Sequence, residues 1–219
     1  MYDEELDMSE RPTNVQTIEH PIALHALGQV RNRDTPSAIF RQAVATLTRQ
    51  LVYAATSDLE ASQVTIETPF GETTAIQLSE LVSPIAILRS GAAMLETAIE
   101  TLPESQAGHF GVYHDKRVGA TIEYYLKLPD RVEQSRVLLL DPAIGTGKTA
   151  LATIARMKEF GVTDIRFLTL IASTGGIESI ATEFPNVQIA AVAIDDEVGP
   201  NGYLIPGMGD FGDRYYGSK

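Results

Sequence analysis

The chain has 219 residues, of which 44% are hydrophobic, and it carries a formal net charge of −12 at pH 7. This length and composition predict one globular domain with a substantial core, or such a domain with a small appendage. The acidic balance disfavours nucleic acid and membranes as partners, although a locally basic site can still bind an anion. Because the chain has no cysteine, disulfides, thiolate metal sites and cysteine nucleophiles are excluded. No apolar run is long enough to span a membrane, and the acidic N-terminus is unlike a signal peptide, so we expect a cytoplasmic protein.

The first part of the chain predicts a leader and two helices. Residues 1–17 are polar, acidic and without periodicity, so we expect a flexible leader before a single domain at 18–219. An apolar helical stretch follows His20-Pro21. Thr35-Pro36 then has the form of a helix start, and the residues after it keep one helical face apolar to about Ser57.

A first hairpin and a core strand come next. Residues 64–68 and 73–78 are rich in β-branched residues and flank a turn at Pro69-Phe70-Gly71-Glu72. Residues 82–88 then have the pattern of a core strand, which ends at Arg89-Ser90-Gly91 before a helix.

A second pair of strands predicts a protruding arm at about 109–128. Its strands, 110–113 and 121–126, flank a long polar turn. An arm of this kind covers a site or a partner subunit more often than the core. Since a lone two-stranded ribbon is marginal in water, the arm indicates a homodimer or homotetramer.

The stretch 136–151 organises the rest of the chain. Its apolar run from Val137 to Leu140 predicts a strand buried on both faces, as in a parallel sheet. Asp141 follows at the carboxyl end of that strand, where open α/β sheets place their ligands. The next loop has two glycines, a lysine and two threonines before a helical pattern begins at Ala150. Backbone N–H groups that converge beside a helix N-terminus predict a phosphate site.

Two kinds of phosphate site fit this loop. Gly145 to Thr149 resembles the end of a P-loop, and Ile189 to Asp195 could supply the strand and aspartate of a Walker B motif. The first P-loop glycine would then fall on Pro142, which has no N–H to offer. A ribose phosphate fits better, because Asp141 can accept hydrogen bonds from two sugar hydroxyls while the loop amides bind the 5′-phosphate. A turn without a ligand is the third interpretation, which so many glycines beside a carboxylate disfavour.

The remaining elements alternate. A helix to Phe160 is followed by a strand at 165–171, a helix at 177–184 and a strand at 187–194. This order predicts an α/β fold with a parallel sheet flanked by helices. The tail at about 199–217 has glycines too closely spaced for a regular element, yet its aromatic and aliphatic residues are unlike a disordered tail, so we expect a packed, irregular segment.

Four segments together resemble the uracil phosphoribosyltransferase family, and the resemblance extends from His20 to Lys219. They are Pro84-Ile85-Ala86-Ile87-Leu88-Arg89-Ser90-Gly91, Glu123-Tyr124-Tyr125-Leu126-Lys127-Leu128-Pro129, the loop 141–149, and Tyr203 to Gly217 with its Pro206-Gly207-Met208-Gly209-Asp210-Phe211-Gly212-Asp213-Arg214 run. The resemblance implies a phosphoribosyltransferase-like fold with a small hood. It also implies transfer of ribose 5-phosphate from phosphoribosyl pyrophosphate (PRPP) to uracil, giving UMP and diphosphate, with Mg²⁺ as cofactor.

The same resemblance implies roles for individual residues. Asp141 would hold the ribose hydroxyls, Arg89 would bind the pyrophosphate, and Asp210 would face the sugar or the waters of the metal, so these three are the catalytic candidates. No side chain is expected to bind Mg²⁺ directly. Backbone groups would pair with the uracil carbonyls and N3–H. The candidate substrate-binding residues are Arg89, His114, Asp141, Pro142, Ala143, Ile144, Gly145, Thr146, Gly147, Lys148, Thr149, Leu204, Gly209, Asp210 and Phe211.

Some positions depart from the family pattern. His114 replaces an arginine that contacts pyrophosphate, Gly145 replaces an alanine, and Lys148 replaces the second glycine of the loop. Leu24 and Ala26 stand where many bacterial members have lysines linked with activation by GTP, which is a candidate effector here. A paralogue that senses uracil or a nucleotide without turnover is therefore an alternative to an enzyme, and a P-loop nucleotide-binding protein is a second.

Structural interpretations stand beside these functional ones. Without the family, Arg89 at a strand end would be a surface salt-bridge partner, and Asp210 and Asp213 would cap turns. His20 and His25 are expected to be structural, because no motif gives them chemistry.

Overall fold

The central sheet of the protein has eight strands. The computed structural model describes residues 14–115 and 120–218, except for the side chains of residues 114 and 115. The strand order is β1-β10-β9-β7-β4-β5-β6, with β8 added beside β9, and all neighbouring strands pair in parallel except β5 and β6. The strands are β1 (Val15–Thr17), β4 (Val82–Leu88), β5 (Gly108–Asp115), β6 (Ala120–Lys127), β7 (Arg136–Leu140), β8 (Ala143–Ile144), β9 (Ile165–Ser173) and β10 (Gln188–Asp195).

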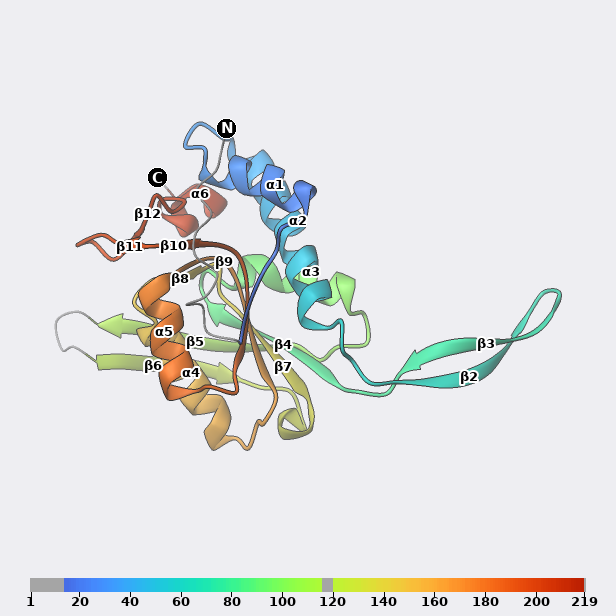
Figure 1. Ribbon diagram of the computed structural model, residues 1–219. Helices are drawn as coiled ribbons and strands as arrows, with labels where there is room; N and C mark the ends of the chain where they lie inside the picture. The colour runs from blue at the N-terminus through green and yellow to red at the C-terminus, as the bar shows by residue number, and fades with distance from the viewer. Residues whose placement is uncertain (1–13, 116–119, 219) are drawn as a thin grey trace.

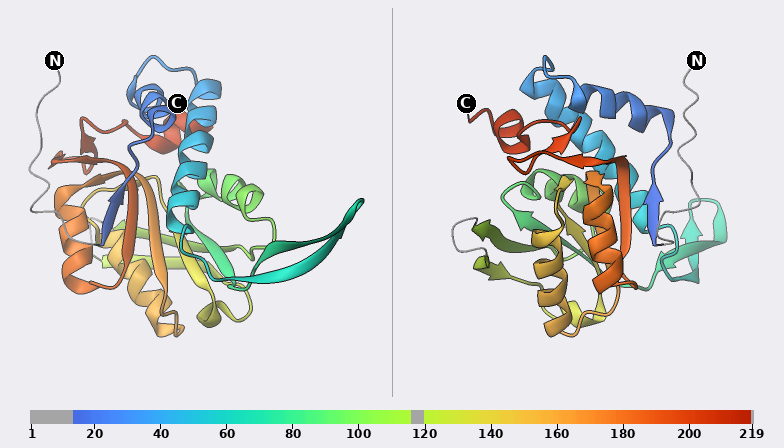
Figure 2. Two further views of the ribbon diagram at one scale, coloured as in Figure 1. Left: turned by 45° about the vertical axis from the view of Figure 1, so that its right-hand side comes forward. Right: turned by 60° about the vertical axis from the view of Figure 1, so that its left-hand side comes forward.

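Helices cover both faces of this sheet (Figures 1 and 2). One core cluster joins one face to α1, α2, α3 and α6, and a second cluster joins the other face to α4 and α5. Among the described residues, no helix is both long and apolar enough to cross a membrane. The helices are α1 (Pro21–Arg31), α2 (Ser37–Ala55), α3 (Ala92–Thr101), α4 (Lys148–Glu159), α5 (Thr174–Glu183) and α6 (Phe211–Tyr216).

The apolar run of β7 has the two-sided burial expected of a central parallel strand. Leu138 and Leu140 belong to the core cluster under α2 and α3, whereas Val137 and Leu139 belong to the cluster under α4 and α5. Successive side chains of a strand point to opposite faces, so a strand covered on both sides needs apolar residues throughout. The predicted α/β fold with a parallel sheet flanked by helices is confirmed.

The leader predicted at 1–17 overlaps the sheet, because Val15–Thr17 form a strand. Val15 to Thr17 form β1, which pairs in parallel with β10 at the sheet edge. Asn14 fixes the start of this strand: its side chain donates to the carbonyl of Val187 over 2.6 Å, and its own carbonyl accepts from the N–H of Ile189 over 2.8 Å. Three residues are too few to show a strand period in the sequence. Residues 1–13 lie outside the described part of the chain.

The element that projects farthest is the first predicted hairpin, not the second. Strands β2 (Ala61–Thr68) and β3 (Gly71–Leu78) form a separate two-stranded sheet that extends away from the body (Figures 1 and 2). The arm predicted at 109–128 is instead anchored, because β5 pairs in parallel with β4 over Gly108–Gly111. It is therefore no lone ribbon, and the inference of an oligomer from a marginal ribbon applies to β2 and β3.

The tail contains a regular element that the sequence analysis missed. Phe211–Tyr216 form α6, and the two short strands β11 (Glu197–Val198) and β12 (Leu204–Ile205) pair before it. The glycines that argued against a helix mostly flank it: Gly209 and Gly217 have φ of 72° and 70° and lie on either side. Gly217 ends the helix in the left-handed conformation that glycine allows.

Candidate active site

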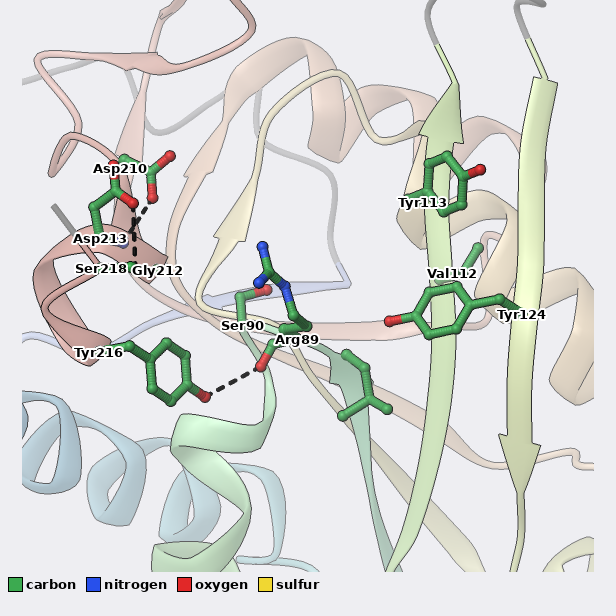
Figure 3. A pocket seen from close by; sticks show the side chains of 11 residues that line it. Arg89, Ser90, Val112, Tyr113, Tyr124, Asp210, Gly212, Asp213, Tyr216 and Ser218 are labelled. Carbon is green, nitrogen blue, oxygen red and sulfur yellow. Dashed lines mark hydrogen bonds between the residues drawn. The ribbon is translucent and has the colours of Figure 1, made fainter.

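A cleft opens where the carboxyl ends of β4 and β7 face the C-terminal segment. Its volume is about 690 Å³, and Figure 3 shows its walls: Arg89 and Ser90 follow β4, Tyr113 and Tyr124 come from β5 and β6, and Asp210 and Tyr216 come from the C-terminal segment. A smaller cavity of about 280 Å³ lies beside it, lined by residues 141–143 and by Leu204, Met208 and Phe211 among others. The two cavities share Ser90, Asp210 and Gly212 and therefore adjoin. They can hold two ligands, or two parts of one ligand, next to each other.

Asp141 stands at the end of β7, in the wall of the smaller cavity. Burial raises the pKa of its carboxyl to about 7, against the lowering effect of hydrogen bonds from the hydroxyl of Ser90 and the N–H of Ala143. The Ser90 hydroxyl donates to Oδ1 over 2.7 Å. Gly91 makes this approach possible, because a Cβ there would collide with the carbonyl oxygen of Leu140. A buried carboxylate near the end of a central strand, with lone pairs left over, suits a ligand that brings hydroxyl donors.

The loop after Asp141 leads into the N-terminus of α4. Ala143 and Ile144 form the short strand β8, which the sequence analysis did not predict, and Gly147 adopts φ of 77° as the residue before the helix. Lys148 and Thr149 are therefore the first residues of α4, which has 12 residues. The N–H groups in the first turn of a helix have no backbone carbonyl within the helix to bind. They give the α4 N-terminus a partial positive charge, which attracts phosphate.

A second strand-to-helix turn holds this loop in place. Ser173 donates through its hydroxyl to the carbonyl of Gly145 over 2.6 Å and accepts from the N–H of Gly176 over 2.8 Å. A Cβ on Gly147 would lie only 3.1 Å from the carbonyl oxygen of Gly176. Thr146 and Lys148 remain exposed, so their side chains can reach a ligand at the helix N-terminus.

The Walker B interpretation of Asp195 is wrong. Asp195 is buried, and its carboxylate accepts from Arg31 at 2.6 and 3.0 Å and from the N–H of Gly207 at 2.8 Å. Arg31 also donates to the carbonyl of Gly207 at 3.0 Å. This pair therefore joins α1, β10 and the turn before α6, which gives Asp195 a structural role.

Arg89 is exposed in the cleft, directly after β4, and the peptide bond between Leu88 and Arg89 is cis. Within residues 14–115 and 120–218 its guanidinium has no carboxylate partner, so the interpretation as a surface salt-bridge partner finds no support there. Its carbonyl accepts from the Tyr216 hydroxyl over 3.3 Å, which ties this turn to α6 (Figure 3). A guanidinium without a protein anion can bind an anionic ligand with its planar fork.

Asp210 has a capping role as well as a place in the cleft. Its Oδ1 accepts from the N–H of Asp213 over 2.9 Å, so it is the N-cap of α6, and its Oδ2 accepts from the Tyr203 hydroxyl over 2.6 Å. The capping interpretation is thus confirmed for Asp210. It does not exclude a ligand, because a carboxylate oxygen can accept more than one hydrogen bond.

The candidate residues for binding the uracil base lie in the C-terminal segment, which Arg214 holds in place. Leu204, Met208 and Phe211 are buried, and Gly209 has φ of 72° in the smaller cavity's wall. Arg214 donates to the carbonyls of Val30, of Met208 at 2.8 Å and of Asn32 at 2.6 Å, and lies 4.4 Å from the ring centre of Phe40. Burial lowers its pKa. The arginine of the most specific sequence run is therefore a structural residue that joins α1 and α2 to the tail.

Several site residues were not found from the sequence. Ser90 donates a hydrogen bond to Asp141, and Tyr203 donates one to Asp210. The first contact joins residues far apart in the sequence and the second lies in irregular backbone, so no local sequence pattern predicts them. His114 was predicted, and its backbone lies in β5 opposite Thr121, but its side chain is outside the described part. His20 is structural as expected: its Nδ1 accepts from the N–H of Ile22 at the start of α1.

The fold and the site define a phosphoribosyltransferase-type protein: a mostly parallel sheet, a carboxylate followed by a glycine-rich loop and a helix N-terminus, and an arginine after the neighbouring strand. A solved structure of a protein from Aquifex aeolicus superposes with a TM-score of 0.87 at 28% identity over 94% of this chain and 99% of that one. The adenine phosphoribosyltransferase of Trypanosoma brucei, solved with AMP, pyrophosphate and ribose-5-phosphate, shares the fold with a TM-score of 0.58 at 13% identity over 85% of each chain.

The chain belongs to the uracil phosphoribosyltransferase family, whose model matches residues 17–218. Relatives named uracil phosphoribosyltransferase include that of Clostridium kluyveri, 38% identical over 94% of this chain and all of its own length. The protein of that name from Rhizobium meliloti is 39% identical over 94% of this chain and 99% of its own. The family predicted from the four sequence segments is confirmed.

Proposed function

We propose that this protein transfers the 5-phosphoribosyl group of PRPP to N1 of uracil, giving UMP and diphosphate. The observation that carries the proposal is the placement of Asp141 and the α4 N-terminus beside a cleft that also contains the exposed guanidinium of Arg89. A carboxylate for two hydroxyls, a helix end for a phosphate and a guanidinium for a diphosphate match the three parts of PRPP.

The chemistry follows from this arrangement. The C1′–oxygen bond to diphosphate breaks, N1 of uracil forms the new bond to C1′, and the N1 proton is lost. Because positive charge develops on the sugar, catalysis is chiefly positioning and charge stabilisation. Asp141 would hold the ribose hydroxyls, residues 145–149 would bind the 5′-phosphate, and Arg89 would take up the charge of the leaving diphosphate.

The smaller cavity is the proposed base site. Backbone groups near Leu204 and from Gly209 to Phe211 would pair with the two carbonyls and the N3–H of uracil, while Pro142, Ala143 and Ile144 lie on the Asp141 side. Main-chain pairing of this kind rejects cytosine, because its amino group and unprotonated N3 would leave buried groups unpaired.

Mg²⁺ is the cofactor that the family implies. The described residues contain no cluster of three or more His, Asp or Glu side chains able to hold a metal. Mg²⁺ keeps most of its water and favours substrate phosphates, so the oxygen-rich diphosphate is its expected carrier, with Asp210 near enough to accept from its waters. When bound, the ion would offset the negative charge of the diphosphate.

The deciding experiment is turnover of radiolabelled uracil with PRPP and Mg²⁺, with cytosine as the control base. Formation of labelled UMP from uracil and not from cytosine supports the proposal. Because Lys148 and His114 depart from the family pattern, a sensor that binds without turnover is the second candidate. Binding of uracil or UMP by calorimetry, with no product after long incubation, would favour the sensor.

Regulation by GTP is a further part of the proposal, and it is tested by measuring rates with and without GTP. Of the two positions that differ from the family here, Ala26 is 3% exposed and offers no side chain to an effector, whereas Leu24 is exposed.

Assembly is the last part of the proposal. A homodimer or homotetramer is proposed from the β2–β3 hairpin, which carries exposed Ile66, Phe70 and Ile76.

A further inference from the structure

The β5–β6 ribbon contains an irregularity next to the cleft. Phe110 pairs with Leu126 and Gly111 with Tyr125, but the next pair is Val112 with Glu123. Tyr124 is therefore the extra residue of a β-bulge and has no partner across the ladder. Bulges of this kind redirect a side chain and are frequent beside active sites.

The ring of Tyr124 lies over a glycine. A Cβ on Gly111 would stand 2.7 Å from Cε2 and 2.8 Å from Cζ of Tyr124, and 2.8 Å from Cβ of Tyr125. Any other residue at 111 would therefore displace the Tyr124 ring and also press on β6. On its other side the ring contacts Tyr113, with ring centres 6.1 Å apart. Gly111 and Tyr113 thus hold the ring in one orientation before a ligand arrives, which lowers the entropy cost of using it.

The ring is directed into the cleft. Figure 3 shows it extending from β6 toward Arg89, with its hydroxyl at the leading end. Tyr124 is 53% exposed, and in the part of the chain that the structure describes no protein group accepts from its hydroxyl. Its cavity is the one with Arg89; it does not line the smaller cavity of Asp141 and Leu204. A phenol beside the exposed guanidinium of Arg89 is a second donor for the same anion.

We propose, on the basis of the function proposed above, that Tyr124 is a substrate-binding residue whose hydroxyl donates a hydrogen bond to the diphosphate of PRPP, alongside Arg89. Uracil is not its ligand, since the base cavity lies on the other side of Ser90 and Asp210. The bulge, the bare Gly111 and the Tyr113 ring together orient this one phenol.

The test compares Tyr124→Phe with Tyr125→Phe. Tyr125 is the matched control, because it is the next residue of β6, is 48% exposed, and does not line the cleft. Binding of PRPP and of inorganic pyrophosphate is measured by calorimetry without uracil, and KM and kcat are measured with both substrates. Loss of one hydrogen bond to a charged group should weaken PRPP and pyrophosphate binding roughly tenfold in Tyr124→Phe. The KM for uracil and the thermal midpoint should stay at the parent values, and Tyr125→Phe should match the parent throughout.

A second variant examines the glycine. Gly111→Ala keeps the hydroxyl but displaces the ring, so it should lose PRPP affinity to a similar extent, and the double variant Gly111→Ala/Tyr124→Phe should lose little more. Because the new Cβ also meets Cβ of Tyr125, the thermal midpoint of Gly111→Ala is measured to separate this effect from a disturbed strand. PRPP and pyrophosphate affinities of Tyr124→Phe equal to those of the parent, or an equal loss in Tyr125→Phe, would overturn the assignment. A parent that fails to bind PRPP would overturn the proposed function as well, so the two failures are distinguishable.

Discussion

At the scale of single residues, Asp141 has the strongest link between environment and chemistry. Its pKa is raised from 3.8 to about 7 by burial, and the bonds from Ser90 and Ala143 oppose this rise. The ionised form accepts from two sugar hydroxyls, whereas the protonated form has lost one acceptor. We therefore expect kcat/KM for PRPP to fall as the pH drops below about 7, since kcat/KM reports the free enzyme. Ser90→Ala removes a bond that lowers the pKa, so its acid limb should lie at higher pH.

The same group has an effect of opposite sign on stability. A folded-state pKa above the unfolded value means that the folded protein binds the extra proton between pH 3.8 and about 7. The ligand-free protein therefore loses stability from this group as the pH rises through that window. In urea unfolding, the stability of Asp141→Asn relative to the parent should increase toward pH 8. The activity of the variant should be lower than that of the parent. A pH-independent difference in unfolding midpoint would contradict the raised pKa.

Asp210→Asn separates the charge of this residue from its capping role. Asparagine is as good an N-cap as aspartate, so the bond from the Asp213 N–H and the helix α6 should persist. We expect kcat/KM to fall on the order of 10²-fold, as when an electrostatic contact to the transition state is lost. Circular dichroism and the thermal midpoint control for the fold; wild-type kinetics would remove Asp210 from the reaction.

His114→Arg addresses the departure in the arm. A free imidazole has a pKa of ~6.5, so a histidine over the diphosphate is mostly neutral at pH 7.5, whereas a guanidinium stays charged. If residue 114 contacts the diphosphate, the KM for PRPP should climb from pH 6 to 8 in the parent, by more than the titration of PRPP itself explains. The arginine variant should flatten that climb and bind PRPP more tightly by about 1–2 kcal/mol. Identical KM profiles for the two proteins would show that residue 114 does not reach the diphosphate.

At the scale of elements, the base of the β2–β3 hairpin is held by one buried arginine. Arg136, 5% exposed at the start of β7, contacts Asp58 at 2.6 Å, Asp164 at 2.9 Å and Glu80 at 3.0 Å. Asp58 and Glu80 lie just before β2 and just after β3. A hydrogen bond from Arg166 is the largest cause that lowers the pKa of Asp58, to about 2, so its stabilising effect is present above pH 3.8 and is lost as the pH falls toward 2.

Arg136→Met should therefore destabilise the protein, because Glu80 loses its cation and Asp58 and Asp164 keep only Arg166. The expected loss is about 3–5 kcal/mol in the free energy of unfolding near neutral pH, shrinking as acid protonates the carboxylates. Arg49→Met is the matched control: it breaks the exposed pair with Glu100 and should cost less than about 1 kcal/mol. Equal losses in the two variants would show that burial gives Arg136 no special role.

How far the sequence could predict these elements depends on how local their causes are. The strand 82–88, the loop after Asp141 and the helices α2 and α4 were predicted, because apolar period, proline and glycine act within a few residues. The strand β1 was missed, since its only support is pairing with β10, and α6 was missed because the flanking glycines hid its Asp210 cap. In the candidate site, Asp141 was predicted from its place at a strand end, whereas Arg89 was predicted from the family resemblance. The contacts of Ser90, Arg31 and Arg214 depend on tertiary approach and leave no sequence period.

At the scale of the whole molecule, the site is assembled from segments at both ends of the chain. The turn after β4 and the loop after β7 form the proposed PRPP side, whereas the proposed base side comes from the last residues. Arg31 and Arg214 join α1 and the loop after it to that tail, so the first helix is needed to hold the base cavity in shape. The opposite end of the molecule is different in character, since β2 and β3 project with little of the body against them (Figure 1).

That projecting hairpin leads to the last prediction. Phe70 at its tip is fully exposed (102%), and Ile76 and Leu78 are 68% and 50% exposed. An isolated two-stranded ribbon with apolar residues on its surface is marginal in water, so we expect a second copy of the chain to cover it. Light scattering after size exclusion should give the mass of a dimer or tetramer for the parent and a smaller mass for the double variant Phe70→Ser/Ile76→Ser. Tyr53→Ser is the control, because Tyr53 is an exposed aromatic (63%) on α2, outside the hairpin. A parent that elutes as a monomer, or a hairpin variant with the parent's mass, would show that the hairpin is stable without a second copy.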